Sequence, residues 1–119
     1  MPDDDLQITE QDLICFFEHA HVSREYGDDW YDSDSVYEKK FDTGMTVTFA
    51  LHPIHKDMRL CIFQGDKVIY DMQAVSVRDI TYIKEKDTDC LKINLNATDW
   101  IEVKIKPELE IKQKSGSLT

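Results

Sequence analysis

The clearest structural signal in the sequence is the stretch Met45-Thr46-Val47-Thr48-Phe49-Ala50-Leu51. Its large apolar side chains stand at every second position, and small or polar residues separate them. A period of two is typical of a β-strand with one buried face, because successive side chains of a strand point to opposite sides. Residues 45–51 therefore predict a half-buried strand.

Similar apolar patterns recur on both sides of this stretch. We expect further strands at residues 37–41, 58–62, 67–72, 77–86, 91–95 and 101–105. Beyond Pro107, which cannot donate a ladder hydrogen bond, the chain can continue through residues 109–111 only as an edge or a bent strand. Turns are expected at residues 42–44, 64–66, 87–89 and 96–99. Connections this short cannot make parallel crossovers, so the strands should form an antiparallel meander.

One helix is expected before the strands. Thr9 is a good N-cap, Asp12 can complete a capping box with it, and Ile8 can pack on Leu13 across the cap. The apolar stripe at helical spacing consists of Leu13, Phe16, Phe17 and Ala20. We predict a helix from Glu10 to His21.

The sequence thus predicts an α+β fold, with one N-terminal helix packed on an antiparallel meander sheet of six to seven strands. The sheet either stays open or curls into a partly closed barrel. We expect residues 1–119 to form a single domain, with residues 1–7 as a flexible acidic leader and residues 113–119 as a frayed tail.

Composition excludes several classes of function. The chain carries a net charge of −10, with 24 acids against 14 lysines and arginines. Nucleic acids and anionic membranes both require cationic protein surface, so neither is an expected partner. No apolar run approaches the roughly 20 residues that cross a bilayer, and the N-terminus lacks a secretory signal. We therefore expect a cytoplasmic protein, in which Cys15, Cys61 and Cys90 are reduced thiols.

The negative charge is concentrated in the first third of the chain. Residues 1–38 contain twelve acids and one base, Arg24, a net of −11. Within them, residues 26–38 mix five carboxylates with four large aromatics, and we call them the acidic-aromatic segment. Carboxylates accelerate encounter with a basic partner, and Tyr and Trp supply much of the energy of protein interfaces. The predicted partner-binding residues are Tyr26, Asp28, Asp29, Trp30, Tyr31, Asp32, Asp34 and Glu38.

Two other interpretations of this segment remain open. It could be a solvated loop whose Trp30 and Tyr37 belong to the core. It could also bind calcium, but the spacing does not fit an EF-hand. Counting from Asp32, Tyr37 stands where the loop requires Gly, and Thr43 where it requires Glu.

Other chemistry has little support in the sequence. The four histidines form two close pairs, His19 with His21 and His52 with His55, whose spacing matches no zinc motif. No Gly-rich phosphate loop, nucleophile elbow or adjacent Cys-His pair is present. We therefore expect no catalytic residues, no metal and no cofactor, and we predict that the protein is not an enzyme.

A small, acidic, single-domain chain without catalytic residues resembles bacterial immunity-type inhibitors in overall profile. This resemblance implies an immunity protein or antitoxin that neutralises a basic partner, such as a nuclease toxin, whose site must attract phosphates. The alternative is a structural or adaptor domain that self-associates through its sheet edges, for example as a homodimer through residues 109–111. A metal-dependent or hydrolytic enzyme is a third hypothesis, which the sequence does little to support.

Overall fold

The helix begins as the sequence predicts. The computed structural model describes residues 7–17, 21–24, 30, 33–84, 88–105 and 108–114. Helix α1 spans Glu10–Phe16, and Thr9 is its N-cap. The Asp12 amide donates to Oγ1 of Thr9, and the Thr9 amide donates to Oδ2 of Asp12, each over 3.1 Å. These reciprocal bonds satisfy two amides that the helix itself leaves without partners, so the capping box is confirmed.

The predicted end of this helix is wrong. It stops at Phe16, with Phe17 as its C-cap, and His21 is instead the first residue of strand β1, His21–Arg24. The reason is a long-range pairing, in which His21 lies opposite Glu38 and Arg24 opposite Ser35. A local apolar period carries no information on such pairing. No helix in the described part of the chain has the length and apolar character needed to span a membrane.

The first five strands form one antiparallel sheet in the order β1-β2-β3-β4-β5. After β1 these are β2 (Ser35–Lys40), β3 (Met45–His52), β4 (Asp57–Gln64) and β5 (Lys67–Ala74). Two of the three turns that connect β2 to β5 use a glycine at positive φ, Gly44 at 91° and Gly65 at 61°. The strand predicted at residues 45–51 is confirmed as β3, with Val47, Phe49 and Leu51 buried.

The last four strands form a second antiparallel sheet in the order β6-β7-β8-β9. They are β6 (Asp79–Lys84), β7 (Asp89–Asn94), β8 (Trp100–Lys104) and β9 (Glu110–Lys114). Strand β9 is at the edge of this sheet, as predicted for residues 109–111. It includes Gln113 and Lys114, which the sequence placed in the frayed tail, while residues 1–6, 106–107 and 115–119 lie outside the described residues.

The prediction of one meander of six to seven strands is wrong, because the described residues form nine strands in two sheets. Neither sheet closes into a barrel. The division falls at residues 75–78, where Ser76 has a positive φ of 52°. There the Val77 amide donates to the carbonyl of Lys56, and the Arg78 amide donates to that of Asn94. The backbone hydrogen bonds of this link thus leave the first sheet and join the second, without the glycine or proline that usually marks a break in the sequence.

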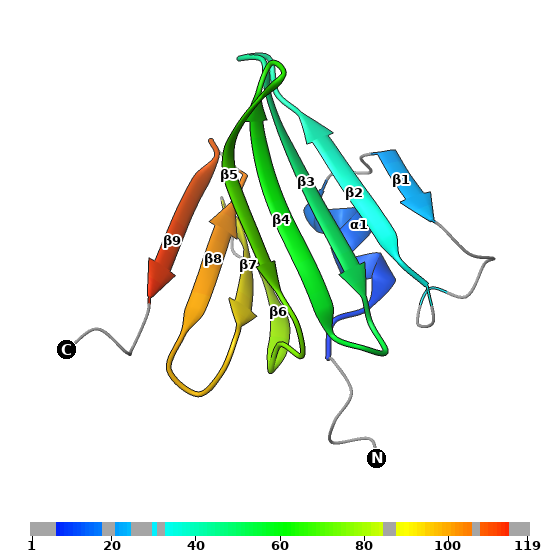
Figure 1. The fold of residues 1–119 in the computed structure, drawn as a ribbon. Coiled ribbons are helices and arrows are strands. Elements are labelled where there is room, and N and C mark those ends of the chain that lie inside the picture. The colour runs from blue at the N-terminus through cyan, green and yellow to red at the C-terminus, as the bar shows by residue number, and fades with distance from the viewer. Residues whose placement is uncertain are drawn as a thin grey trace.

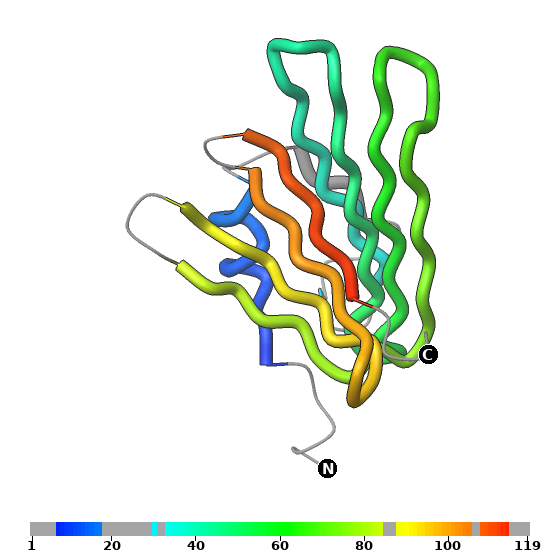
Figure 2. The backbone as a smooth tube through the Cα atoms, turned by 90° about the vertical axis from the view of Figure 1, so that its left-hand side faces the viewer, coloured from blue at the N-terminus to red at the C-terminus, as the bar shows by residue number. Residues whose placement is uncertain are grey.

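The two sheets and the helix form two layers. Figure 1 shows the five-stranded sheet in front, with α1 behind β2 and β3, β6 and β7 behind β4 and β5, and β8 and β9 to the left of β5. The view in Figure 2 separates the sheets, with β6–β9 on one side and β2–β5 on the other. The helix and the four-stranded sheet therefore together cover one face of the five-stranded sheet, and no described element covers its other face.

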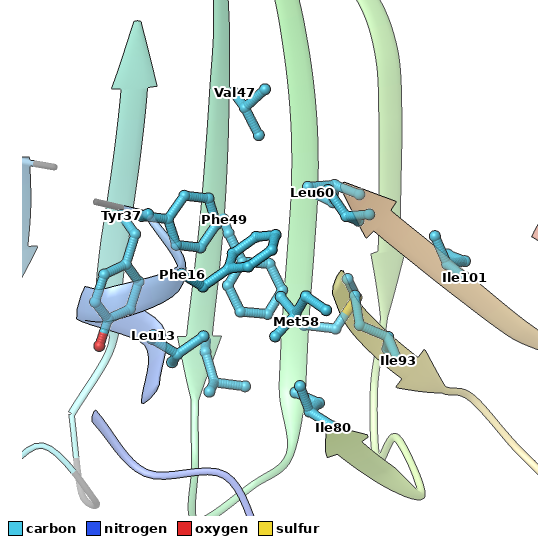
Figure 3. Packing of buried hydrophobic residues seen from close by; sticks show 14 of the residues in the cluster. Leu13, Phe16, Tyr37, Val47, Phe49, Met58, Leu60, Ile80, Ile93 and Ile101 are labelled. Atoms are coloured by element: carbon cyan, nitrogen blue, oxygen red, sulfur yellow. The ribbon is translucent and has the colours of Figure 1, made fainter. Parts of the chain in front are cut away.

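The core fills the space between these layers. Figure 3 shows Leu13 and Phe16 of α1 facing Phe49 and Met58 of the five-stranded sheet. Phe17 stacks on Phe49 at 6.1 Å between ring centroids. Ile80, Leu91, Ile93, Ile101 and Val103 enter the same cluster from the four-stranded sheet. Because residues of α1 and of both sheets belong to one cluster, a single core joins the helix to both sheets. Full burial of one such side chain contributes about 1.5–3 kcal/mol to stability. The predicted packing of an N-terminal helix on a sheet is confirmed.

Candidate functional surface

The structure describes three of the eight predicted partner-binding residues, Trp30, Asp34 and Glu38. The other five, Tyr26, Asp28, Asp29, Tyr31 and Asp32, lie outside the described residues. The three that are described do not share one surface. Trp30 packs against the core, whereas Asp34 and Glu38 lie in or beside β2, next to the uncovered face of the five-stranded sheet.

Trp30 is attached to the core through Tyr37. The indole Nε1 of Trp30 donates a hydrogen bond to the Tyr37 hydroxyl over 2.9 Å. Tyr37 is fully buried and stacks on Phe17, with ring centroids 5.8 Å apart. This arrangement fits the interpretation in which Trp30 and Tyr37 belong to the core. Trp30 remains half-buried, and contact of its exposed part with a partner stays a prediction.

Strand alternation sets the direction of Asp34. Its neighbours Ser33 and Ser35 are buried, whereas Asp34 itself is half-buried. Because successive residues of extended chain point to opposite sides, Asp34, Val36 and Glu38 face away from the core. Among the residues that the structure describes, no lysine or arginine forms an ion pair with Asp34 or Glu38. No described cation therefore neutralises either carboxylate.

Asp34 lies on the rim of a hollow of about 370 Å³ at one end of the uncovered face. The hollow is formed by the start of β2, the end of β3, the start of β4 and the end of β5. Its lining residues are Asp34, Val36, Ala50, Leu51, Asp57, Met58, Arg59, Gln73, Ala74 and Val75. We call this site the Asp34 hollow.

Cross-strand register brings the walls of this hollow together. Val36 lies opposite Ala50, Ala50 opposite Arg59, and Arg59 opposite Gln73. Directly opposed residues of antiparallel strands project to the same face, so these four side chains form one row across β2–β5. Val75 is the most exposed of the large hydrophobic residues described, at 70%.

An ion pair fixes Arg59 beside the hollow. Its guanidinium donates to both carboxylate oxygens of Asp71, over 3.1 Å from Nε and 2.9 Å from Nη2. The thiol of Cys61 donates to the same carboxylate over 3.3 Å. These bonds, with that of Arg59 first, lower the pKa of Asp71 below its ordinary value, whereas burial and then the bond to Asp71 raise the pKa of Cys61. The Cys61 thiol is thus held protonated, which makes it a poor nucleophile.

Sequence reasoning missed Asp57, Arg59 and Asp71 as parts of this surface. One available signal was alternation in β4, where Asp57, Arg59 and Cys61 are spaced by two residues between the buried Met58, Leu60 and Ile62. The partner of Arg59 depends on the register of the β4–β5 hairpin, which contains a bulge between Ile62 and Phe63. A local pattern does not reveal that bulge.

The described histidines do not form a metal site. The rings of His52 and His55 lie 4.4 Å apart, His21 is in β1, and His19 is outside the described residues. Within the described ranges, no group of three or more His, Cys, Asp or Glu side chains could hold a metal ion. The three cysteines form no disulfide; Cys61 and Cys90 are buried and Cys15 is half-buried.

Comparison with known proteins identifies the fold. No protein-family model matches the chain, and no curated protein matches its sequence. Among solved structures, the chain is similar to one chain of a contact-dependent growth inhibition toxin–immunity protein complex from Klebsiella pneumoniae 342. The superposition has a TM-score of 0.74 and covers 92% of this chain and 96% of that chain, at 18% sequence identity. The two chains therefore share a fold over nearly their whole length.

Proposed function

We propose that this protein is an immunity-type inhibitor, an antitoxin that binds and neutralises a basic toxin in the cytoplasm and catalyses no reaction itself. The observation that carries the proposal is the fold shared with a chain of a toxin–immunity complex over 92% of this chain. A fold alone does not define a function, so the proposal also depends on the charge of this chain.

Charge indicates which side of such a complex this chain would occupy. A toxin that acts on nucleic acid needs a basic site, because its substrate carries phosphates. This chain has the opposite character, with a net charge of −10. It is therefore suited to occupy such a site, and poorly suited to bind the substrate itself.

The acidic-aromatic segment would make the first contact. Its carboxylates would attract the basic toxin at long range and raise the association rate roughly 10- to 1000-fold at low salt. Tyr26, Tyr31 and the exposed part of Trp30 would then bury area against the toxin. Asp34 and Glu38 would extend this contact onto the uncovered face of the five-stranded sheet.

The direct test is co-expression with the protein encoded by the neighbouring gene. We expect that protein, produced alone in bacteria, to stop growth, and this chain to restore growth and to copurify with it as a stable complex. A neighbouring product that is harmless, or whose toxicity this chain does not relieve, would contradict the proposal.

Charge-reversal variants test the proposed contact. Changing Asp28, Asp29 and Asp32 together to Lys should abolish protection and leave the circular dichroism spectrum unchanged. The matched control changes Asp42, Asp66 and Glu108 to Lys, which alters net charge equally at exposed positions outside the segment. Equal loss of protection in both variants would show that net charge alone matters, and would remove the segment as the interface.

A second candidate is an adaptor that self-associates through sheet edges. It is favoured by one observation: among the described strands, β5 pairs with β4 alone and β9 with β8 alone, which leaves an edge of each sheet open. The exposed Lys112 and Lys114 of β9 oppose such pairing, because edge lysines discourage strand addition. Light scattering distinguishes the candidates, since only the adaptor requires a dimer whose population rises with concentration.

A further inference from the structure

We propose that the Asp34 hollow is a specific binding site for one lysine or arginine side chain of the partner. This inference rests on the proposed function, because it assigns to the basic toxin a side chain that inserts at this place. It goes beyond general charge attraction, since it assigns a defined pocket with apolar walls and two carboxylates. The surface potential of the acidic-aromatic segment alone would provide neither the pocket nor its apolar walls.

The walls of the hollow match the stem of a basic side chain. Val36, Ala50 and Val75 present aliphatic surface, and the 70% exposure of Val75 leaves apolar area that a partner can cover. Lysine and arginine bury their methylene groups against such surface and keep the charged end near polar groups. A volume of about 370 Å³ gives room for one such side chain and accompanying water.

The charges of the hollow suit a cation. Asp34 and Asp57 line it, and the Ser76 amide donates to Oδ1 of Asp57 over 3.2 Å, which fixes that carboxylate in place. Arg59 also lines the hollow, but its guanidinium is bonded at two points to Asp71. The Arg59–Asp71 pair is neutral as a unit, so Asp34 and Asp57 leave the hollow with an excess of negative charge.

The position of the hollow connects it with the proposed interface. Asp34 belongs to the acidic-aromatic segment and also lines the hollow. The hollow opens on the face that no described element covers. A partner attracted by the acidic-aromatic segment would therefore meet the hollow without any rearrangement of the sheet.

Nuclear magnetic resonance with small probes tests the site without the toxin. We would titrate isotope-labelled protein with N-acetyl-lysine methylamide and N-acetyl-arginine methylamide, and use N-acetyl-glutamine methylamide as the neutral control. We expect concentration-dependent shifts of the Val36, Ala50 and Gln73 amides with both basic probes, and none with the neutral probe. Shifts spread over all acidic surfaces, no shift at the hollow, or equal shifts with the neutral probe would each overturn the proposal.

Two charge variants make this test specific. Asp34→Asn combined with Asp57→Asn should remove the shifts, and an asparagine at position 57 can still accept the hydrogen bond from Ser76. The control pair, Asp42→Asn with Asp66→Asn, removes the same charge at the β2–β3 and β4–β5 turns and should keep the shifts. Retention of the shifts in the first pair, or their equal loss in both pairs, would overturn the assignment.

A filling variant tests the same site with the toxin. Ala50→Leu should occupy the hollow without changing charge and weaken toxin binding on the order of tenfold, whereas Thr46→Leu, on the same face of β3 nearer its hairpin turn, should not. Full affinity in Ala50→Leu would show that the toxin does not use the hollow. The two proposals fail separately, because binding of the basic probes without toxin neutralisation would refute only the inhibitor function.

Discussion

At the scale of single residues, the bond between Trp30 and Tyr37 joins two aromatics of the acidic-aromatic segment, of which Tyr37 is buried in the core. Tyr37→Phe removes the acceptor of the indole N–H and should lower the free energy of unfolding by about 1 kcal/mol. In a Trp100→Phe background, the emission of Trp30 should also shift to longer wavelength as its indole becomes more hydrated. Denaturant titration and fluorescence check this prediction.

Tyr70→Phe is the matched control for that prediction. It removes a hydroxyl whose bond to Gln113 is exposed, so it should change stability little and leave Trp30 emission unaltered. Equal effects of the two variants would mean that the Trp30–Tyr37 bond has no special structural role.

The ion pair of Asp71 should make the stability of the fold depend on pH in the acidic range. Its bonds to Arg59 and Cys61 lower its pKa in the folded state from an ordinary value of 3.8. Stability from this group is therefore complete above its unfolded-state pKa and is lost as the pH falls through the lower, folded-state value. Asp71→Asn should flatten the fall in unfolding free energy between about pH 5 and about pH 2.

Denaturant titrations across this pH range measure that effect. Asp66→Asn, at the turn of the same hairpin, is the control. If the unfolding free energies of the wild type and of Asp71→Asn fall in parallel from neutral to acidic pH, Asp71 does not contribute to the pH dependence of stability.

The sequence identifies the acidic candidate residues but not the residues that surround them in space. Asp34 was identified because it stands in an acidic run, and that property is visible locally. Its proximity to Asp57 and Arg59 in one hollow depends on the register of four strands, which contact each other across long sequence separations. That information lies in the tertiary structure.

At the scale of elements, two glycine turns set the register of the hairpins in the five-stranded sheet. A Cβ at Gly44 would lie 3.0 Å from Nε2 of Gln64, at a φ of +91°. Moving Gln64 away would break its bond to the carbonyl of Thr43. Gly44→Ala should therefore cost about 1–2 kcal/mol of stability, as measured by thermal or denaturant unfolding.

Gly65 provides the comparison. Its φ is +61°, and no atom lies within 4 Å of a Cβ built there. Because asparagine tolerates this left-handed conformation, Gly65→Asn should cost less than Gly44→Ala. The reverse order would contradict the described turn geometry.

Elements with strong local signals were predictable from the sequence, and elements defined by long-range pairing were not. The cap at Thr9, the alternation of residues 45–51 and the turns at Gly44 and Gly65 all depend on neighbouring residues. Strand β1 has only four residues and exists by pairing with β2. The local apolar pattern therefore predicts a helix as far as His21, where the structure has the first residue of β1.

At the scale of the whole molecule, both sheets depend on one core. The link at residues 75–78 divides the strands into two sheets, yet buried side chains of α1 and of both sheets form one cluster. We predict a single cooperative unfolding transition, with fluorescence and circular dichroism changing together. Two separate transitions would mean that the sheets are independent units, contrary to the prediction of one domain.

The whole-molecule charge is what the proposed function depends on most. The most direct test is the association rate of this chain with the toxin encoded by the neighbouring gene, measured by stopped-flow fluorescence at increasing salt. We predict complex formation whose rate constant falls at least about tenfold between low and high salt, because ions screen the attraction of opposite charges. Absence of a complex, or an association rate indifferent to salt, would contradict the proposal that this acidic fold neutralises a basic toxin.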